Sequence, residues 1–169
     1  MGANRASGGN RRAGYAGGMD QSVGLDNDVR LHLYRHFVEH ARPPSPAETA
    51  KELGIREREA ARAYRRLAEG HVIVLEPGTD EVWMANPLSA RPTPFRVRTT
   101  AGREYFGNCS WDAPGVLAML GADGDVETAC PDCDEPLRLE IRGGELSPLE
   151  AVGHFAVPAA HWWDDIGYT

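Results

Sequence analysis

The stretch Asn86-Pro87-Leu88-Ser89-Ala90-Arg91-Pro92-Thr93-Pro94 divides the 169-residue chain into two halves with different hydrophobic periodicity. Its prolines cannot continue a helix or a central strand. Before this joint, apolar residues recur at helical spacing; after it, they alternate with polar residues as in a half-buried strand. The sequence therefore predicts an α+β protein, with an N-terminal winged-helix-like three-helix domain followed by a mainly antiparallel sheet domain with a packed helix.

The half before the joint predicts three helices and a hairpin within a domain at 27–90. The first helix, predicted at 27–41, carries apolar residues at helical spacing: Val29, Leu33, Phe37. Ser45-Pro46-Ala47-Glu48 has the spacing of a capping box with Pro at the first helical position, and it opens a short helix that Gly54 ends.

The third helix is expected from Arg56 to Glu69, with Gly70 as its stop. Two β-type runs follow, at 71–75 and 81–85, joined by a Pro-Gly turn. Three helices and a two-stranded wing are typical of a winged helix-turn-helix.

The charge balance argues against nucleic acid as a partner, because the net charge is −7. The third helix carries a modest excess of arginine, which fits a recognition helix and equally a solvated helix face. One alternative therefore stays open: a winged-helix DNA-binding or soft-metal-sensing protein without catalytic activity, in which Arg62 and Arg65 would contact DNA.

The N-terminal residues are low in complexity, rich in Gly and Arg, and free of acidic residues up to position 18. We predict a disordered tail over residues 1–26. A true start at Met19, rather than Met1, is an alternative.

The chain has no apolar run long enough to span a bilayer, and its first residues do not resemble a signal peptide. Three cysteines, two of them in a C-x-x-C, point to reduced thiols rather than a disulfide framework. We expect a cytoplasmic protein without a membrane partner.

The half after the joint, 91–169, predicts a sheet and one helix. Alternating runs predict strands around 95–99, at 126–130 and at 137–141, and 152–157 is another strand candidate. The apolar run in Ser110–Leu120 predicts a helix packed on this sheet.

Cys109 and Asp112 lie at the start of this helix. The helix dipole and free N–H groups there should lower the pKa of Cys109 toward the thiolate, the form that binds soft metals. Asp112, about one turn along, could hold or deliver a proton beside that sulfur. The plainer alternative is a buried cysteine acting as a small hydrophobe and an aspartate placed by the dipole.

The second cysteine motif, Cys130-Pro131-Asp132-Cys133, can supply half of a tetrahedral zinc site. No second C-x-x-C exists, although Cys109 and His154 would complete the ligand count. A structural zinc protein, a structural knuckle and buried thiols all remain open, whereas a thioredoxin-like role is disfavoured because no βαβ pattern surrounds the motif.

Residues 27–169 resemble the alkylmercury lyase (organomercurial lyase) family. The matching stretches are MANPLSARPTPFRV at 84–97, GNCSWDA at 107–113, CPDCDEPLRLEIR at 130–142 and HFAVPAAHWWDDI at 154–166. The resemblance implies an N-terminal winged-helix-like domain and a sheet-rich catalytic domain. It also implies cleavage of a carbon–mercury bond to a hydrocarbon and Hg(II), without a required cofactor.

The resemblance also implies residue roles. The cysteine matching Cys109 attacks the mercury of R–Hg⁺, and the aspartate matching Asp112 handles the proton that cleaves the bond. The cysteine matching Cys130 is mainly structural, and Cys133 is a further thiol. The partners expected are a small organomercurial substrate and, for the Hg(II), a mercuric reductase or thiol acceptor.

One departure bears on activity. Family members carry a further catalytic cysteine beyond the HWWDD segment, about where this chain stops at Thr169. The resemblance therefore implies a catalytic domain shortened at its C-terminus and poor turnover by a lone Cys109. His154, His161 and the Trp162-Trp163 pair are expected to serve packing rather than chemistry.

Overall fold

The computed structural model describes residues 16–147 and 150–167, with side chains described from Val23 onward. The described residues fall into two compact units that divide between Ala85 and Asn86. No helix within the described part of the chain is long and apolar enough to cross a membrane.

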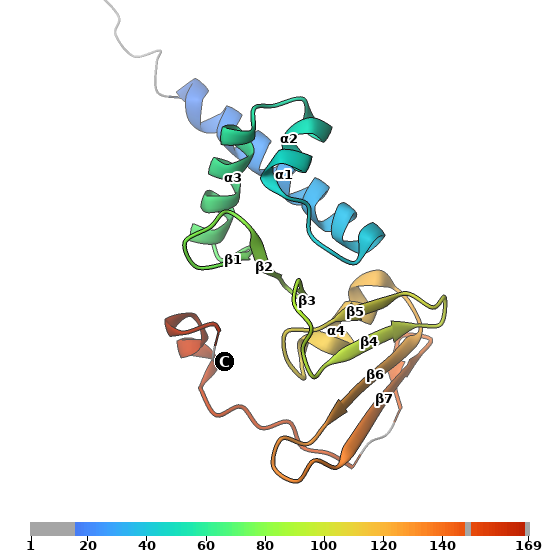
Figure 1. The fold of residues 1–169 in the computed structure, drawn as a ribbon. Coiled ribbons are helices and arrows are strands. Elements are labelled where there is room, and N and C mark those ends of the chain that lie inside the picture. The colour runs from blue at the N-terminus through green and yellow to red at the C-terminus, as the bar shows by residue number, and fades with distance from the viewer. Residues whose placement is uncertain (1–15, 148–149, 168–169) are drawn as a thin grey trace, which may run out of the picture. The chain divides into compact units, whose positions relative to one another are not determined.

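The first unit contains three helices followed by a hairpin (Figure 1): α1 (Ala16–His40), α2 (Pro46–Leu53), α3 (Glu57–Glu69), β1 (Val74–Leu75) and β2 (Val82–Ala85). The two strands pair antiparallel, with Val74 opposite Met84. The predicted helices and their order are confirmed.

The start of α1 corrects one prediction. The helix begins at Ala16, so residues 16–26 are helical rather than part of a disordered tail. The rest of the predicted tail, 1–15, lies outside the described residues. Gly17, Gly18 and Gly24 lower the helix propensity of this segment without forbidding a helix, so the predicted helix start lay too late in the chain.

Capping and a buried hydrogen-bond network hold the first unit together. The Ser45 hydroxyl accepts from the Glu48 backbone N–H, and the Glu48 carboxylate accepts from the Ser45 N–H, as the capping box predicts. In the core, the Tyr64 hydroxyl donates to the Pro44 carbonyl at 3.0 Å and lies 2.7 Å from the Thr49 hydroxyl. Burial raises the pKa of Tyr64 to about 12, so the phenol stays protonated.

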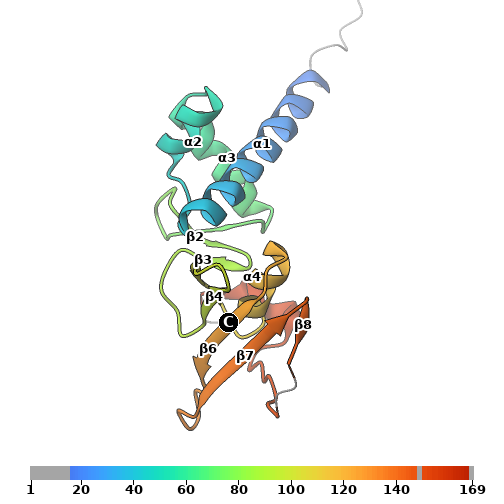
Figure 2. The ribbon, with the colours of Figure 1, turned by 90° about the vertical axis from the view of Figure 1, so that its right-hand side faces the viewer.

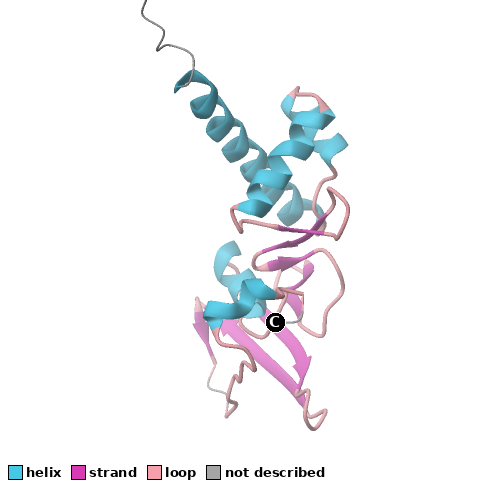
Figure 3. Ribbon diagram, turned by 90° about the vertical axis from the view of Figure 1, so that its left-hand side faces the viewer, coloured by secondary structure: helices cyan, strands magenta, loops and turns pink. Residues whose placement is uncertain are grey.

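The second unit is a five-stranded sheet with one helix on it. Its strands follow the order β5-β4-β6-β7-β8, and the pairs are antiparallel. The elements are β3 (Leu88–Ser89), which lies outside this sheet, β4 (Arg96–Thr99), β5 (Glu104–Phe106), α4 (Asp112–Leu120), β6 (Gly124–Ala129), β7 (Pro136–Arg142) and β8 (Glu145–Leu146). Figure 2 shows α4 against the sheet, and Figure 3 shows the long β6–β7 hairpin.

The core of this unit lies between α4 and the sheet. The helix contacts β4, β6 and β7. The buried side chains at this interface come from both layers: Val97, Tyr105, Ala113, Val116, Leu117, Val126, Ile141. The predicted antiparallel sheet with a packed helix is therefore confirmed.

The segment after β8 differs from prediction. Residues 152–157 form no strand, and Val152 is 94% exposed. A Gly at 153 and a Pro at 158 interrupt the short apolar run, which pairs with no neighbouring strand. A short 3₁₀ helix, η1 (Ala159–Asp164), follows.

Candidate functional site

Gly107 sets the position of the segment that carries Cys109. Its N–H donates to the Phe95 carbonyl at 3.0 Å, and its carbonyl accepts from the Thr93 hydroxyl at 2.6 Å. A β-carbon on Gly107 would lie 2.6 Å from the Cα of Ala113, which leaves no room for any side chain there. The first turn of α4 therefore rests directly on the backbone of Gly107.

Cys109 lies just before α4, and Asp112 is the first residue of that helix. The Ala113 N–H donates to the Cys109 carbonyl at 3.1 Å, which closes the turn into the helix. The Asp112 N–H donates to the Cys109 sulfur at 3.4 Å, and a further hydrogen bond joins the two side chains. The structure thus brings thiol and carboxyl together, as the spacing predicted.

The pKa values of the pair correct one prediction. Burial raises the pKa of Cys109, more than the hydrogen bond from the Asp112 backbone lowers it. The expected thiolate in the resting protein is therefore wrong, because desolvation outweighs the N–H groups of the helix start. Burial also raises the pKa of Asp112, against the lowering effect of hydrogen bonds from Asn108 and Cys109.

Asn108 is a site residue that the sequence argument missed. Its side-chain amide donates to an Asp112 carboxylate oxygen at 3.0 Å and to the Asn86 side-chain oxygen at 3.0 Å. The amide therefore fixes the carboxyl orientation and ties it to the segment before β3. A polar residue next to the cysteine was the only available signal, since the partner Asn86 is 22 residues away.

The site is reachable from outside. Cys109 and Asp112 are both half-buried, and Ser110 and Trp111 between them are exposed. Trp111 is 72% exposed, so its indole is not packed into the core over the Cys109 sulfur.

Cys130 and Cys133 occupy the turn between β6 and β7. Both are free thiols; Cys130 is half-buried and Cys133 is exposed. The pKa of Cys130 is lowered, because the N–H groups of Asp132 and Cys133 and the Cys133 side chain hydrogen-bond to its sulfur. The alternative of two buried thiols is therefore wrong for Cys133.

The mixed zinc site is not formed. Among the residues that the structure describes, no three His, Cys, Asp or Glu side chains gather into a metal site. His154 is exposed and lies outside any strand, contrary to the packing role expected for it. His161 pairs with Asp164 at 3.0 Å, and the Trp162 indole donates to the Val157 carbonyl at 2.8 Å. These contacts organise η1 locally rather than fill the core.

Two arginines of α3 and the arginine that caps it pair with acidic side chains. Arg56 at the N-cap pairs with Glu59, Arg65 with Asp80 and Arg66 with Asp26, each through two side-chain hydrogen bonds. Arg65, one of the two residues named for DNA contact, is therefore already neutralised by the hairpin. This pairing weakens the case for a basic recognition helix.

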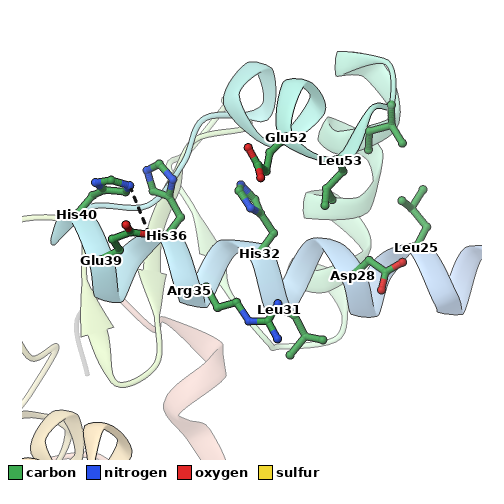
Figure 4. A pocket seen from close by; sticks show the side chains of 11 residues that line it. Leu25, Asp28, Leu31, His32, Arg35, His36, Glu39, His40, Glu52 and Leu53 are labelled. Atoms are coloured by element: carbon green, nitrogen blue, oxygen red, sulfur yellow. Dashed lines mark ion pairs between the residues drawn. The ribbon is translucent and has the colours of Figure 1, made fainter.

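A second candidate region lies in the first unit. A cavity of about 550 Å³ between α1 and α2 is lined by His32, His36 and His40, whose rings are tilted to one another, and Figure 4 shows His32 pointing toward Glu52. The ring centroids of His36 and His40 are 4.2 Å apart. None of its lining residues is a cysteine, serine or threonine, and its histidines do not form a metal site among the described residues.

Comparisons with known proteins agree with the geometry of the second unit. Residues 88–169 match the family model described as MerB, alkylmercury lyase. The structure is similar to the crystal structure of the mercury-bound form of MerB2, with a TM-score of 0.58 and 20% sequence identity. The similarity covers 77% of this chain and 66% of that chain, just under two thirds of its length. No curated protein matches the chain.

These matches confirm the resemblance stated from the sequence, and the fold class with it. At 20% identity, the likeness to MerB2 supports the fold alone. The family model covers β3, Cys109, Asp112 and the two cysteines of the hairpin turn.

Proposed function

We propose that this chain is a carbon–mercury lyase, in which Cys109 binds the mercury of a small organomercurial and Asp112 protonates the mercury-bound carbon. The observation that carries the proposal is the contact between the two residues, a 3.4 Å hydrogen bond from the Asp112 N–H to the Cys109 sulfur together with one between the side chains. The match of residues 88–169 to the alkylmercury lyase family model supplies the reaction class.

The first step is attack of the Cys109 sulfur on R–Hg⁺. The thiol loses its proton as the S–Hg bond forms, and the Asp112 carboxylate, already hydrogen-bonded to that thiol, accepts the proton. The product is a Cys109–S–Hg–R adduct beside a protonated Asp112. Soft Hg(II) prefers sulfur to the neighbouring carboxylate oxygens.

The second step cleaves the carbon–mercury bond. Asp112 gives its proton to the carbon, the electron pair of the C–Hg bond forms the new C–H bond, and R–H leaves. Hg(II) stays on the Cys109 sulfur, and Asp112 returns to the carboxylate. The proton removed from the thiol is thus the one delivered to carbon, which balances the cycle.

The raised pKa values fit these roles. Because its pKa is raised, the Cys109 thiol keeps its proton until the metal arrives. The thiol is hydrogen-bonded to the Asp112 carboxyl, whose pKa is also raised, so the proton can pass to Asp112 in the first step and to carbon in the second. Asn108 keeps the Asp112 carboxyl facing this position. We further propose a cytoplasmic setting, in which a mercuric reductase or a thiol acceptor takes up the Hg(II).

The test is release of benzene from phenylmercury by the purified, reduced protein. We expect benzene in at least stoichiometric amount from the unaltered chain and none above buffer from Cys109→Ser. Glu145→Gln, an exposed carboxylate on β8, is the matched control and should release benzene like the unaltered chain. Equal release from Cys109→Ser, or none from the unaltered chain, would reject the proposal.

A further inference from the structure

The turn between β6 and β7 holds two thiols that the proposed lyase reaction does not use. The turn is fixed by its backbone: the Cys130 N–H donates to the Glu135 carbonyl at 2.9 Å, and the Asp134 N–H donates to the Cys130 carbonyl at 2.9 Å. Asp134 has a φ of 58°, the left-handed conformation that lets the chain reverse. Cys130 and Cys133 therefore lie on one tight loop rather than on flexible chain.

The two sulfurs face each other within this loop. The side chain of Cys133 hydrogen-bonds to the Cys130 sulfur, and the N–H groups of Asp132 and Cys133 also point at that sulfur. Hydrogen bonds of this kind stabilise a thiolate at Cys130. Cys133 is exposed, as are Pro131 and Asp132, so a metal ion can enter from solvent.

We infer that Cys130 and Cys133 form a second soft-metal site, which binds Hg(II) as a linear bis-thiolate. Binding replaces two S–H bonds by two S–Hg bonds and releases two protons. Zinc fits less well, because it takes four ligands and no third His, Cys, Asp or Glu joins the pair within the described part of the chain. Two sulfurs in one loop match the two-coordinate preference of Hg(II), a soft ion.

The sheet register brings this loop to the same end of the sheet as Cys109. Arg96 at the start of β4 pairs with Phe106 on one side and with Glu127 on the other. Cys109 follows Phe106 by three residues, and Cys130 follows Glu127 by three. The two thiol-bearing segments thus leave the sheet at one end, on either side of β4.

The shared end of the sheet gives the dithiol a role that rests on the proposed function. Cleavage leaves Hg(II) on one sulfur, and two thiols hold mercury more tightly than one. Transfer would turn the Cys109–S–Hg⁺ form and two thiols into a free Cys109 thiol, the bis-thiolate complex and one proton. The turn would then hold the product until an external acceptor removes it.

The binding site is tested by titrating reduced protein with mercuric chloride in the presence of glutathione as competing monothiol. The Cys109→Ser variant, which lacks the proposed nucleophile, should bind one Hg(II) per chain with release of two protons. The double variant Cys109→Ser/Cys133→Ser should bind Hg(II) at least roughly 100-fold more weakly. Loss of a residue that only supports a metal ligand can cost that much, and Cys133 is proposed as a ligand itself. Cys133 is exposed, so this replacement leaves the core intact.

The inference would be overturned if the Cys109→Ser variant could not take Hg(II) in competition with glutathione. It would also be overturned if the double variant bound Hg(II) as tightly as Cys109→Ser. Because the titration uses a variant without the nucleophile, its outcome does not depend on lyase activity. The transfer role has its own readout: after phenylmercury turnover, iodoacetamide should alkylate Cys109 and spare Cys130 and Cys133. The reverse labelling pattern would contradict transfer.

Discussion

Gly107 and Ala113 are so close that a β-carbon on the glycine would lie 2.6 Å from the Cα and from the backbone nitrogen of the alanine. Both neighbouring atoms belong to the backbone of α4, which cannot move aside like a flexible side chain. The start of the helix, and with it the placement of Cys109 and Asp112, therefore depends on the absence of a side chain at 107.

Gly107→Ala should push the first turn of α4 away from the sheet. We expect it to lower the free energy of unfolding by about 1–3 kcal/mol, as overpacking does, and to lower benzene release by up to about 10²-fold, the cost of a misplaced reacting group. Gly115→Ala on the same helix is the control, because its β-carbon would meet only Pro87 at an ordinary 3.5 Å. Urea unfolding of both variants checks this; equal stability of the two would contradict the packing argument.

Asn108→Ala should move the pH dependence of carbon–mercury cleavage upward. The Asn108 amide donates to the Asp112 carboxylate and so lowers the pKa of Asp112; without it, that pKa rises further. In the Cys109–S–Hg–R adduct Asp112 must keep the proton that it took from the thiol, so the rate at which the adduct is cleaved falls as pH rises through the pKa of Asp112. The fall should therefore come at higher pH in the variant, measured as single-turnover benzene release across pH. An unchanged or downward-shifted profile would contradict the role given to Asn108.

Tyr64→Phe should destabilise the first unit. The change leaves the Pro44 carbonyl and the Thr49 hydroxyl, both buried, without their shared partner. Unsatisfied buried polar groups cost about 1–3 kcal/mol, so we expect a loss of that order in denaturant unfolding. A second change, Thr49→Val, removes one orphaned group and should recover part of the loss; a further additive loss would argue against the network.

His36 should make the first unit less stable in mild acid. Its pKa is lowered by burial first and by the nearby charge of His40 next. The folded state therefore binds its proton less readily than the unfolded state, whose pKa is near 6.5. Stability is then present above about pH 6.5 and declines as pH falls through that range. His36→Gln should flatten this decline in urea midpoints; an unflattened decline would show that other groups cause it.

Local signals in the sequence were sufficient for most of the fold. The capping box at Ser45 and the stop at Gly54 bound α2 where predicted, because such signals act through neighbouring residues. Alternation at Val97 and across 126–141 likewise predicted strands that the sheet confirms. The strand predicted at 152–157 was wrong, because a strand needs a pairing partner and the local sequence pattern does not show whether one exists.

The site was predictable in its residues but not in its electrostatics. The three-residue spacing placed Asp112 beside Cys109 by helix geometry alone. The sign of the thiol pKa shift depended on how deeply tertiary packing buries the sulfur. The hydrogen bonds of Asn108 to Asp112 and to Asn86 were not predicted, and the second joins residues that only the tertiary fold brings together.

The most direct test of the central claim follows the phenylmercury adduct of Cys109 by intact-protein mass spectrometry after mixing one equivalent with reduced protein. In the unaltered chain the adduct should form and then lose its phenyl group as benzene, leaving Hg(II) on the protein. In Asp112→Asn the adduct should form more slowly, because the carboxylate that accepts the thiol proton is missing, and then persist. Its cleavage should be slowed by about 10²–10⁴-fold, the usual contribution of a general acid. Cleavage of the adduct at the same rate in both proteins would contradict the account.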